Sequence, residues 1–556
     1  MKKNNLIVIS IYILLFLWGI TALTRGFPDT ERFFSHYSDE RLVLTSIMKF
    51  GSPRGEAGTL NLAPTSILHP PLYHYLTFIP IGAFFVIGKL TGFFSDKVDF
   101  VRFYFNNTQY FFLIGRIMSY IFFWAAAIMI FKIARLFYDK TVAHITTFAY
   151  LLVPKFIFDF STTRPDALLF LMVSIFLYLF LRYCLDNKRI RYLYLSAFFV
   201  GVSTATKYNA LFLGFIFIPA LLYQMRHRNY KNILPLLSKI AFFIFLGFFI
   251  CNPFFIIRYK TYAYNFFLFV TVTVPDCYSG YARSLFLLTR IKDISSTFYL
   301  NLFGLLILIL GCRHFYKRNK ELAIYLFFVS LVFELYFSLY HKDCSPTYYL
   351  NPLLPIAALV FSAGVDFTLR FKRRLLPISI MFFAILFLNH YWVLRDLTAR
   401  PDYLQKARAF IEKNIPEFTN ICIVSNRNLP QLNMTRESYN HLIQAGAHEN
   451  HYKEMDNDEN YDSIFRELRI QSLTKKPQYN LIKWDKKIKD EKDLVDFLKK
   501  NNIKYVISGG VSMINGKRLE DTKSAFLMRT FESPNGKKYN RGGVYLYKIH
   551  EKKLFY

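Results

Sequence analysis

The stretch "HPPLYHYLTFIPIGAFFVIGKL", His69 to Leu90, decides how the chain is threaded through a membrane. From Leu72 onward it is apolar enough to cross a bilayer. Two prolines come just before it, and Pro80 and Gly82 lie inside it, so we expect a broken helix. Whether this helix crosses the membrane sets the side on which every later loop lies.

The composition is that of a membrane protein. Of 556 residues, 53% are hydrophobic and 19% are aromatic. The apolar residues form runs of about 17–25, which is the length that spans a bilayer. The first run, Leu6 to Leu23, follows Lys2 and Lys3 and has no small-x-small cleavage site. It therefore predicts a retained first span rather than a signal peptide.

The net charge of +31 does not indicate nucleic-acid binding. Much of the positive charge lies in short loops between apolar runs, as the positive-inside rule expects, and the chain contains no nucleic-acid module. We expect the N-terminus and five basic clusters to face the cytoplasm. The clusters are Lys132/Arg135/Lys140, Arg182/Lys188/Arg189/Arg191, Arg226/Arg228/Lys231, Arg313/Lys317/Arg318/Lys320 and Arg370/Lys372/Arg373/Arg374.

The side assigned to these basic clusters decides whether Leu72–Leu90 crosses the membrane, because each crossing moves all later loops to the opposite side. If Leu72–Leu90 crossed, every later basic cluster would face outside. We therefore predict a juxtamembrane or re-entrant helix on the outer face. This topology gives about eleven spans in all, at 6–23, 108–131, 142–158, 167–184, 192–206, 208–224, 235–256, 294–312, 321–339, 347–369 and 376–394. Outside lie loops 24–107, 159–166, 257–293 and 340–346, and the chain after about 395.

The tail has a different character. Residues 1–394 form the predicted α-helical polytopic domain, and 395–556 a soluble α/β domain on the outer side. "KARAFIEKNI" has helical periodicity, and "ICIVSN", "IKYVISGG" and "GGVYLYKI" have the pattern of strands. The polar stretches Asp456–Asp462 and Thr474–Asp496 are expected to be solvated loops or surface helices.

Six cysteines show neither a CxxC pair nor zinc spacing. We expect free thiols, with a disulfide between Cys277 and Cys344 as the alternative.

Several ionisable and aromatic residues gather on the outer face in this topology. They are Asp39, Glu40, His69, His74, Arg116, Arg164, Asp166, Lys207, His341, Lys342, Asp343, Tyr348 and Tyr349. Ionisable residues at such depths are functional candidates.

Each candidate also has a simpler explanation. The cations could snorkel to lipid headgroups, Asp166 could cap the helix that follows it, and Asp39 with Glu40 could be a solvated loop pair. His69 and His74 with Asp39 suggest a metal site, but no tight ligand spacing supports it. Taken together, however, three cations and three acids on one face are harder to dismiss than any one of them alone, namely Arg116, Lys207 and Lys342 with Asp39, Glu40 and Asp166.

Together they suit transfer of a group from a lipid phosphate. A phosphate leaving group needs Arg or Lys nearby, because negative charge grows on it in the transition state. A hydroxyl or amine acceptor needs a carboxylate base. A lipid-linked donor also explains a site at the membrane surface.

The set resembles the polyprenyl-phosphate-sugar glycosyltransferases of the GT-C fold, in glycosyltransferase family 39. That family includes protein O-mannosyltransferases and the transferases that put aminoarabinose on lipid A. The resemblance covers nearly all of residues 1–395. The matching motifs are "YSDE", "HPPLYHYL", "GRIMS", "RPDALL", "ATKYNAL", "CNPFF" and "YYLNPLLP". In one departure, Tyr348 stands where the family commonly has Arg, and we expect Lys342 to supply that charge.

The resemblance implies a role for each residue. The catalytic pair would be Asp39 as base and Glu40 as its partner. Donor phosphate would be bound by Arg116, Lys207 and Lys342. Acceptor-binding or site-lining residues would be His69, Arg164, Asp166, Tyr348 and Tyr349. The family is mostly inverting and often needs no metal, so no cofactor is predicted and a divalent metal is left open.

The predicted function is a multi-pass plasma-membrane (inner-membrane) glycosyltransferase. It would move a sugar from a polyprenyl-phosphate donor to an extracytoplasmic glycolipid, glycan or protein, with membrane lipids as its other partners. The alternative is a polytopic transporter or lipid flippase. Such proteins often show internal repeats and midplane charges, and this chain shows neither. A third hypothesis, an assembly protein whose tail binds partners, leaves Asp39 and Glu40 unexplained.

Overall fold

The computed structural model describes most of the helical part and the framework of the C-terminal part. The described residues are 3–24, 38–48, 50, 70–186, 189–228, 233–256, 259–260, 262–263, 302–339, 351–370, 376–399, 403–424, 432–438, 471, 477–483, 491–508, 513–514, 517–518, 525–532 and 543–549.

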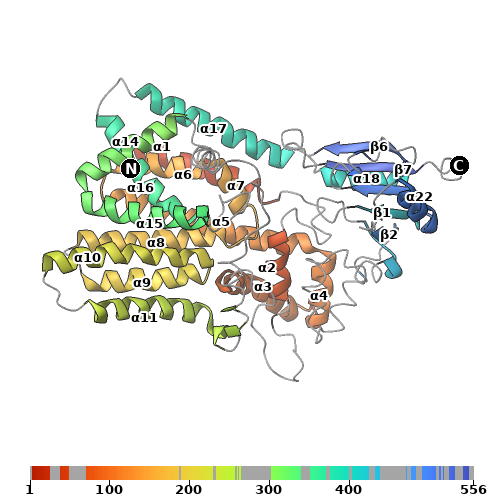
Figure 1. Ribbon diagram of the computed structural model, residues 1–556, viewed down its shortest axis with the longest axis horizontal. Helices are drawn as coiled ribbons and strands as arrows, with labels where there is room; N and C mark the ends of the chain where they lie inside the picture. Colours follow the sequence, from red (N-terminus) through yellow and green to blue (C-terminus); the bar gives the residue numbers. More distant parts are fainter. Residues whose placement is uncertain are drawn as a thin grey trace.

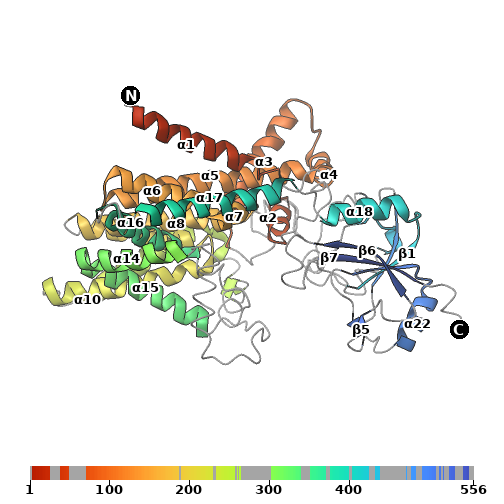
Figure 2. The same ribbon diagram turned by 90° about the horizontal axis from the view of Figure 1, so that it is seen from above.

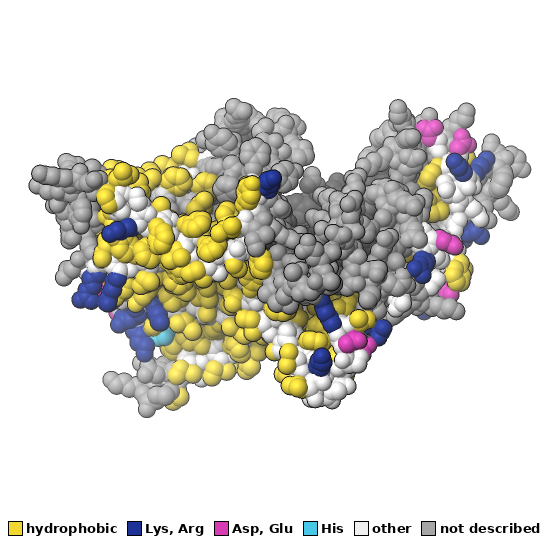
Figure 3. All heavy atoms as spheres, turned by 90° about the horizontal axis from the view of Figure 1, so that it is seen from below, with side chains coloured by type: hydrophobic (Ala, Val, Ile, Leu, Met, Phe, Trp, Pro, Cys, Tyr) yellow, Lys and Arg dark blue, Asp and Glu magenta, His cyan; other side chains and the backbone are white. Residues whose placement is uncertain are grey.

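A bundle of long apolar helices forms the larger part of the molecule (Figure 1). Its elements are α1 (Lys3–Ile20), α5 (Thr108–Arg135), α6 (Lys140–Leu151), α7 (Pro154–Phe160), α8 (Asp166–Leu185), α9 (Ile190–Thr204), η2 (Tyr208–Ile216), α10 (Phe217–Arg228), α11 (Leu234–Cys251), η3 (Pro253–Phe255), α14 (Leu302–Arg318), α15 (Lys320–Leu339), η6 (Asn351–Leu353), α16 (Leu354–Arg370) and α17 (Leu376–Ala399). Its surface is a broad apolar face with Lys and Arg gathered towards one end (Figure 3). The chain is a multi-pass membrane protein.

By length and composition, five described helical segments could cross a membrane, and a sixth if α6 and α7 count as one span. The predicted total of eleven spans stays a prediction. The sequence also predicted one span over 142–158, and the structure divides it into α6 and α7, which bend by 67°. Pro154 causes the division, because it has no backbone N–H and its ring disfavours a helical residue before it.

Helices α2 (Ser38–Met48), α3 (Leu72–Leu90) and α4 (Lys97–Asn106) lie together at one end of the bundle, and α3 runs crosswise to α5 and α8 (Figures 1 and 2). α1 and α5 are antiparallel neighbours: Tyr120 donates to the carbonyl of Phe16 at 2.5 Å, and Arg116 donates to that of Leu23 at 3.0 Å. The segment 24–107 therefore begins and ends at the same end of the bundle, as expected if α3 does not cross the membrane. By length and composition alone, α3 could cross.

The prediction that α3 would be broken was wrong, because Pro80 lies inside one continuous helix. Pro80 removes one backbone hydrogen bond, but buried Tyr73, Thr77 and Ile81 hold the helix against its neighbours.

Close helix contact in the bundle depends on small residues, as is usual in membranes. A Cβ on Gly201 of α9 would lie 1.9 Å from the carbonyl oxygen of Ile244 in α11, and a Cβ on Gly247 would lie 2.1 Å from that of Phe198. Only glycine lets these two backbones touch.

The C-terminal part is an α/β unit of α18 (Tyr403–Asn414), β1 (Asn420–Ile423), β2 (Asn480–Lys483), α22 (Glu491–Lys500), β3 (Tyr505–Ser508), β4 (Met513–Ile514), β5 (Lys517–Arg518), β6 (Ala525–Glu532) and β7 (Gly543–Ile549). The five-stranded sheet has the order β2-β1-β3-β7-β6. β1 is parallel to β2 and β3, and β7 is antiparallel to β3 and β6. α18 and α22 cover opposite faces (Figure 2).

The predicted helix and three strands of this unit are confirmed as α18, β1, β3 and β7. The prediction for Thr474–Asp496 was wrong at 480–483, which is strand β2. Leu481 is buried there and pairs with Ile421 of β1, so a short apolar side-chain pattern outweighed the polar surroundings. Residues 456–462 lie outside the described residues. The boundary at 394/395 stays a prediction, and α17 continues to Ala399.

Candidate active site

The first buried ion pair joins α2 to α5. Glu40 is 0% exposed and Arg116 is 3% exposed. Arg116 donates from Nε to Oε1 of Glu40 at 3.1 Å and from Nη2 to Oε2 at 3.2 Å, the two-pronged geometry that matches guanidinium to carboxylate. The backbone N–H of Thr163 donates to the same Oε1 at 2.6 Å. Both oxygens of Glu40 are therefore occupied.

The second ion pair centres on Asp166, the first residue of α8, which is fully buried. Nζ of Lys207 donates to its Oδ1 at 2.8 Å, and Nδ2 of Asn351 donates to the same oxygen at 2.7 Å. Nε of Arg164 lies 3.7 Å from Oδ2. Nζ of Lys155 donates in turn to Oδ1 of Asn351. A buried carboxylate needs such partners, because burial without them costs several kcal/mol.

The connection between α7 and α8 joins the two pairs. It contains Thr163, which holds Glu40, and it ends at Asp166. Gly115 lets α5 approach this connection, because a Cβ there would lie 2.3 Å from Cγ2 of Thr163. A single short segment therefore sets the position of both carboxylates.

Helix α3 is tied to the same segment. The hydroxyls of Tyr73 and Ser119 lie 2.7 Å apart, and Ser119 donates to the carbonyl of Thr162 at 2.8 Å. The backbone N–H of Leu72 donates to the carbonyl of Ala205, at the end of α9, at 3.2 Å. The "HPPLYHYL" and "ATKYNAL" motifs thus meet in space.

The structure brings together five of the predicted site residues, which are Glu40, Arg116, Arg164, Asp166 and Lys207. Asp39 lies on α2 beside Glu40, and its side chain lies outside the described residues. So do His69, Lys342, Tyr348 and Tyr349, and the Cys277–Cys344 pair.

The geometry decides between explanations that the sequence left open. Arg116 and Lys207 are buried and paired with carboxylates, so they do not snorkel to headgroups. Asp166 lies inside the first turn of α8 with its carboxylate on Lys207, so it is not the helix cap. Glu40 is buried, so it is not a solvated loop residue.

Sequence reasoning missed Lys155, Asp159, Thr163 and Asn351. The first two lie one turn apart on α7, and Asp159 is 2% exposed. Two ionisable residues inside an apolar stretch are themselves a signal of function. The contacts of Thr163 and Asn351 had no such signal, because they depend on the fold.

The network favours an anionic ligand. Its described cations, Arg116, Lys155, Arg164 and Lys207, outnumber its described carboxylates, Glu40, Asp159 and Asp166, by one. Asp39 and Lys342 would add one charge of each sign. No group of three or more His, Cys, Asp or Glu that could hold a metal occurs among the described residues. Metal independence stays a prediction.

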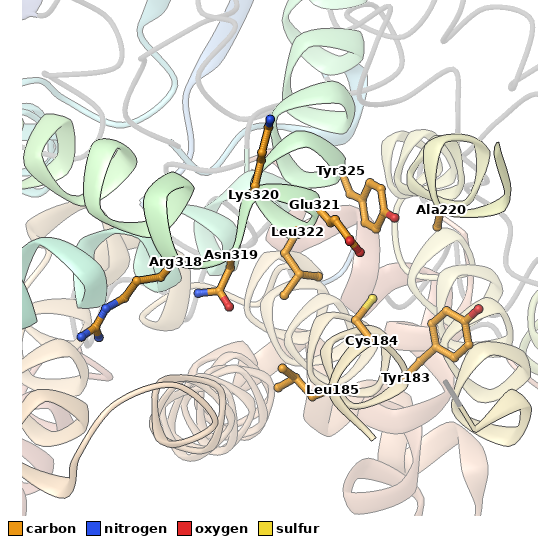
Figure 4. Close-up of a pocket in the computed structure, with 10 residues that line it drawn as sticks. All are labelled: Tyr183, Cys184, Leu185, Ala220, Arg318, Asn319, Lys320, Glu321, Leu322 and Tyr325. Atoms are coloured by element: carbon orange, nitrogen blue, oxygen red, sulfur yellow. The ribbon is translucent and has the colours of Figure 1, made fainter. Parts of the chain in front are cut away.

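A separate cavity of about 280 Å³ lies where α8, α10 and the α14–α15 turn meet (Figure 4). Its wall includes Tyr183, Cys184 and Tyr325, while Lys320 and Arg318 point away from the other lining residues (Figure 4). Along α8, Cys184 is about 27 Å from Asp166 at 1.5 Å per residue, so this cavity is not part of the network.

Comparisons with known proteins agree with this architecture. The family model described as "Dolichyl-phosphate-mannose-protein mannosyltransferase" matches residues 111–250. No curated protein sequence matches significantly. ArnT from Cupriavidus metallidurans, in the apo state, has a similar structure with a TM-score of 0.50 and 12% identity, over 98% of each chain. The archaeal oligosaccharyltransferase AglB from Archaeoglobus fulgidus has a TM-score of 0.42 and 11% identity, over 92% of this chain and 70% of that one.

The similarity to ArnT extends over nearly the whole of both chains, and it concerns the fold. The family match covers α5 to α11, which carry Arg116, Asp166 and Lys207. The resemblance predicted from the motifs is thereby confirmed, and the chain is a membrane protein with the GT-C fold of the polyprenyl-phosphate-sugar glycosyltransferases.

Proposed function

We propose that the chain is a membrane glycosyltransferase that moves a sugar from a polyprenyl-phosphate donor to an extracytoplasmic acceptor. The proposal rests on two buried ion pairs at one end of the bundle, Glu40–Arg116 and Asp166–Lys207, which the connection between α7 and α8 joins. A transporter is not favoured, because these charges gather at an end of the bundle rather than at its middle. The matched family, whose description names a dolichyl-phosphate-mannose donor, supports a lipid-phosphate donor.

Asp39 is the proposed base. It would take the proton of an acceptor hydroxyl or amine, whose heteroatom then bonds to the anomeric carbon. The bond from that carbon to the phosphate oxygen breaks, and its electron pair leaves with the phosphate, which inverts the anomeric centre. Because Arg116 and Thr163 occupy both oxygens of Glu40, Glu40 is better suited to hold the geometry of α2 than to accept a proton.

The cations would stabilise the departing phosphate. We assign this role to Lys207, Arg116 and Lys342; the first two are already held in place by Asp166 and Glu40. Fixed cations in a site with little water stabilise developing charge without reorganising.

We assign the acceptor side of the site to five residues, which are His69, Arg164, Asp166, Tyr348 and Tyr349. The N-terminus would be cytoplasmic, and the α/β unit would lie outside, where it can help recognise the acceptor. No metal is required in this scheme.

The acceptor is identified first, by mass spectrometry of glycolipids and glycoproteins from cells with and without the gene. Purified protein in nanodiscs is then given that acceptor and a labelled polyprenyl-phosphate-sugar. Asp39→Asn should lower the transfer rate about 10²- to 10⁴-fold at unchanged expression, because general-base catalysis contributes about that much. The matched control is Asp99→Asn, at an exposed aspartate of α4.

A wild-type rate in Asp39→Asn would show that the base is another group. Solute uptake into proteoliposomes without any transfer product would replace the enzyme by the transporter. We expect EDTA to leave transfer unchanged, and a loss of activity restored by a divalent cation would contradict this part of the scheme.

A further inference from the structure

Lys155 is the cation of the network that the proposed mechanism does not use. It lies on α7, directly after Pro154 and the 67° bend that separates α7 from α6. An ammonium group in an apolar helix is costly, and such residues mark functional sites in membrane proteins.

The side chain of Lys155 is aimed at the second ion pair. Its Nζ donates to Oδ1 of Asn351, whose Nδ2 donates to Oδ1 of Asp166 at 2.7 Å. Nζ of Lys207 donates to that same oxygen of Asp166 at 2.8 Å. The ammonium groups of Lys155 and Lys207 are therefore linked through one amide and one carboxylate.

Asn351 fixes this arrangement by its two ends. Its carbonyl oxygen accepts from a cation and its NH₂ donates to an anion, so the amide can satisfy both partners only in one orientation. It is 1% exposed, at the start of η6, which leads into α16. The position of Lys155 thus depends on a residue from a distant part of the chain.

Lys155 is less completely buried than its partners. Asp159, Asp166 and Asn351 are buried, whereas Lys155 is partly exposed. Nζ of Lys155 donates to the neutral amide of Asn351, and the described network as a whole holds one more cation than carboxylates. A phosphate oxygen is the kind of ligand that such a group binds.

We propose that Lys155 binds the phosphate of the lipid donor, with Asn351 as the residue that positions it beside Asp166 and Lys207. This inference rests on the proposed function.

The test measures binding of undecaprenyl phosphate and of the uncharged alcohol undecaprenol to purified protein in nanodiscs. The ratio of the two affinities isolates the contribution of the phosphate. Lys155→Met should reduce this ratio about tenfold or more, as expected for loss of a hydrogen bond to a charged group, and Lys155→Arg should restore most of it. Lys89→Met, at an exposed lysine of α3, is the matched control.

Asn351→Leu should lower the same ratio by a smaller factor, because it frees Lys155 from its position without removing the charge. Lys155→Gln keeps a hydrogen-bond donor for Asn351 but removes the charge. If Lys155→Met does not fold, the affinity ratio of Lys155→Gln tests the same role.

The outcomes separate the two proposals. If wild-type protein binds the alcohol as tightly as the phosphate, the proposed function itself fails. If wild-type protein prefers the phosphate and the Lys155 variants keep that preference, or lose affinity for both lipids equally, Lys155 is not a phosphate ligand.

Discussion

Glu40 and Arg116 allow a double-mutant cycle whose size follows from their burial. Glu40 is 0% exposed and Arg116 is 3% exposed, with two direct contacts of 3.1 and 3.2 Å. Removing one member leaves the other as an uncompensated buried charge, which costs about 3–5 kcal/mol. We therefore expect Glu40→Gln and Arg116→Met each to lower the free energy of unfolding by about that amount.

The double variant should cost less than the sum of the two single variants. With both charges removed, no unpaired ion is left, and neighbouring groups in one network commonly couple by about 0.5–3 kcal/mol. We expect a coupling energy near the upper end of that range, because Thr163 and Leu23 add further hydrogen bonds to the same two side chains.

Unfolding in detergent micelles, followed by tryptophan fluorescence, measures all four corners of the cycle. The exposed pair Arg102–Asp99 on α4, at 2.5 Å, is the control, and its cycle should give about 0–1 kcal/mol. A coupling energy at Glu40–Arg116 no larger than that of the control would refute the buried ion pair and the joined site built on it.

Two further predictions concern packing and pH. Gly115→Ala should cost about 1–3 kcal/mol and reduce transfer, because its Cβ would lie 2.3 Å from Thr163, which holds Glu40. Gly82→Ala, whose Cβ would meet nothing closer than 3.7 Å, should change stability by under about 1 kcal/mol, and equal effects of the two changes would disprove the steric argument. In the α/β unit, burial raises the pKa of the Cys422 thiol, so this thiol stays protonated in the folded protein at pH 8–9 while the unfolded thiol begins to ionise. Stability from this group should therefore be complete below about pH 8.5 and fall as the pH rises further, and iodoacetamide should label Cys422 at pH 8.5 only after denaturation, as mass spectrometry of labelled peptides would verify.

The sequence predicted a helical multi-pass membrane protein because charge and hydropathy are read along the chain. The basic loops predict that the segment 24–107 starts and finishes on one side of the bundle. The antiparallel packing of α1 and α5, with Arg116 donating to the carbonyl of Leu23, agrees with this. Pro80 and Pro154 show where this reasoning stops. Both are helix breakers in isolation, but packing keeps α3 continuous, whereas α6 and α7 separate.

The candidate site was predictable where a residue is itself unusual. Glu40, Asp166 and Lys207 are charges at apolar depths, and the structure places them in ion pairs. Thr163 and Asn351 were not predictable, because a backbone N–H and an amide become functional only through what the fold sets against them. The sequence does not record which carboxylate will face which cation.

The long separations within the site have a consequence for how the protein is made. Glu40 and Arg116 are 76 positions apart, Glu40 and Thr163 are 123 apart, and Asp166 and Asn351 are 185 apart. A ribosome delivers these residues to the membrane in that order. An ionisable side chain in or beside an apolar segment is costly until its partner arrives. A nascent chain that ends before residue 351 holds Asp166 without its amide, so the site is completed only late in translation.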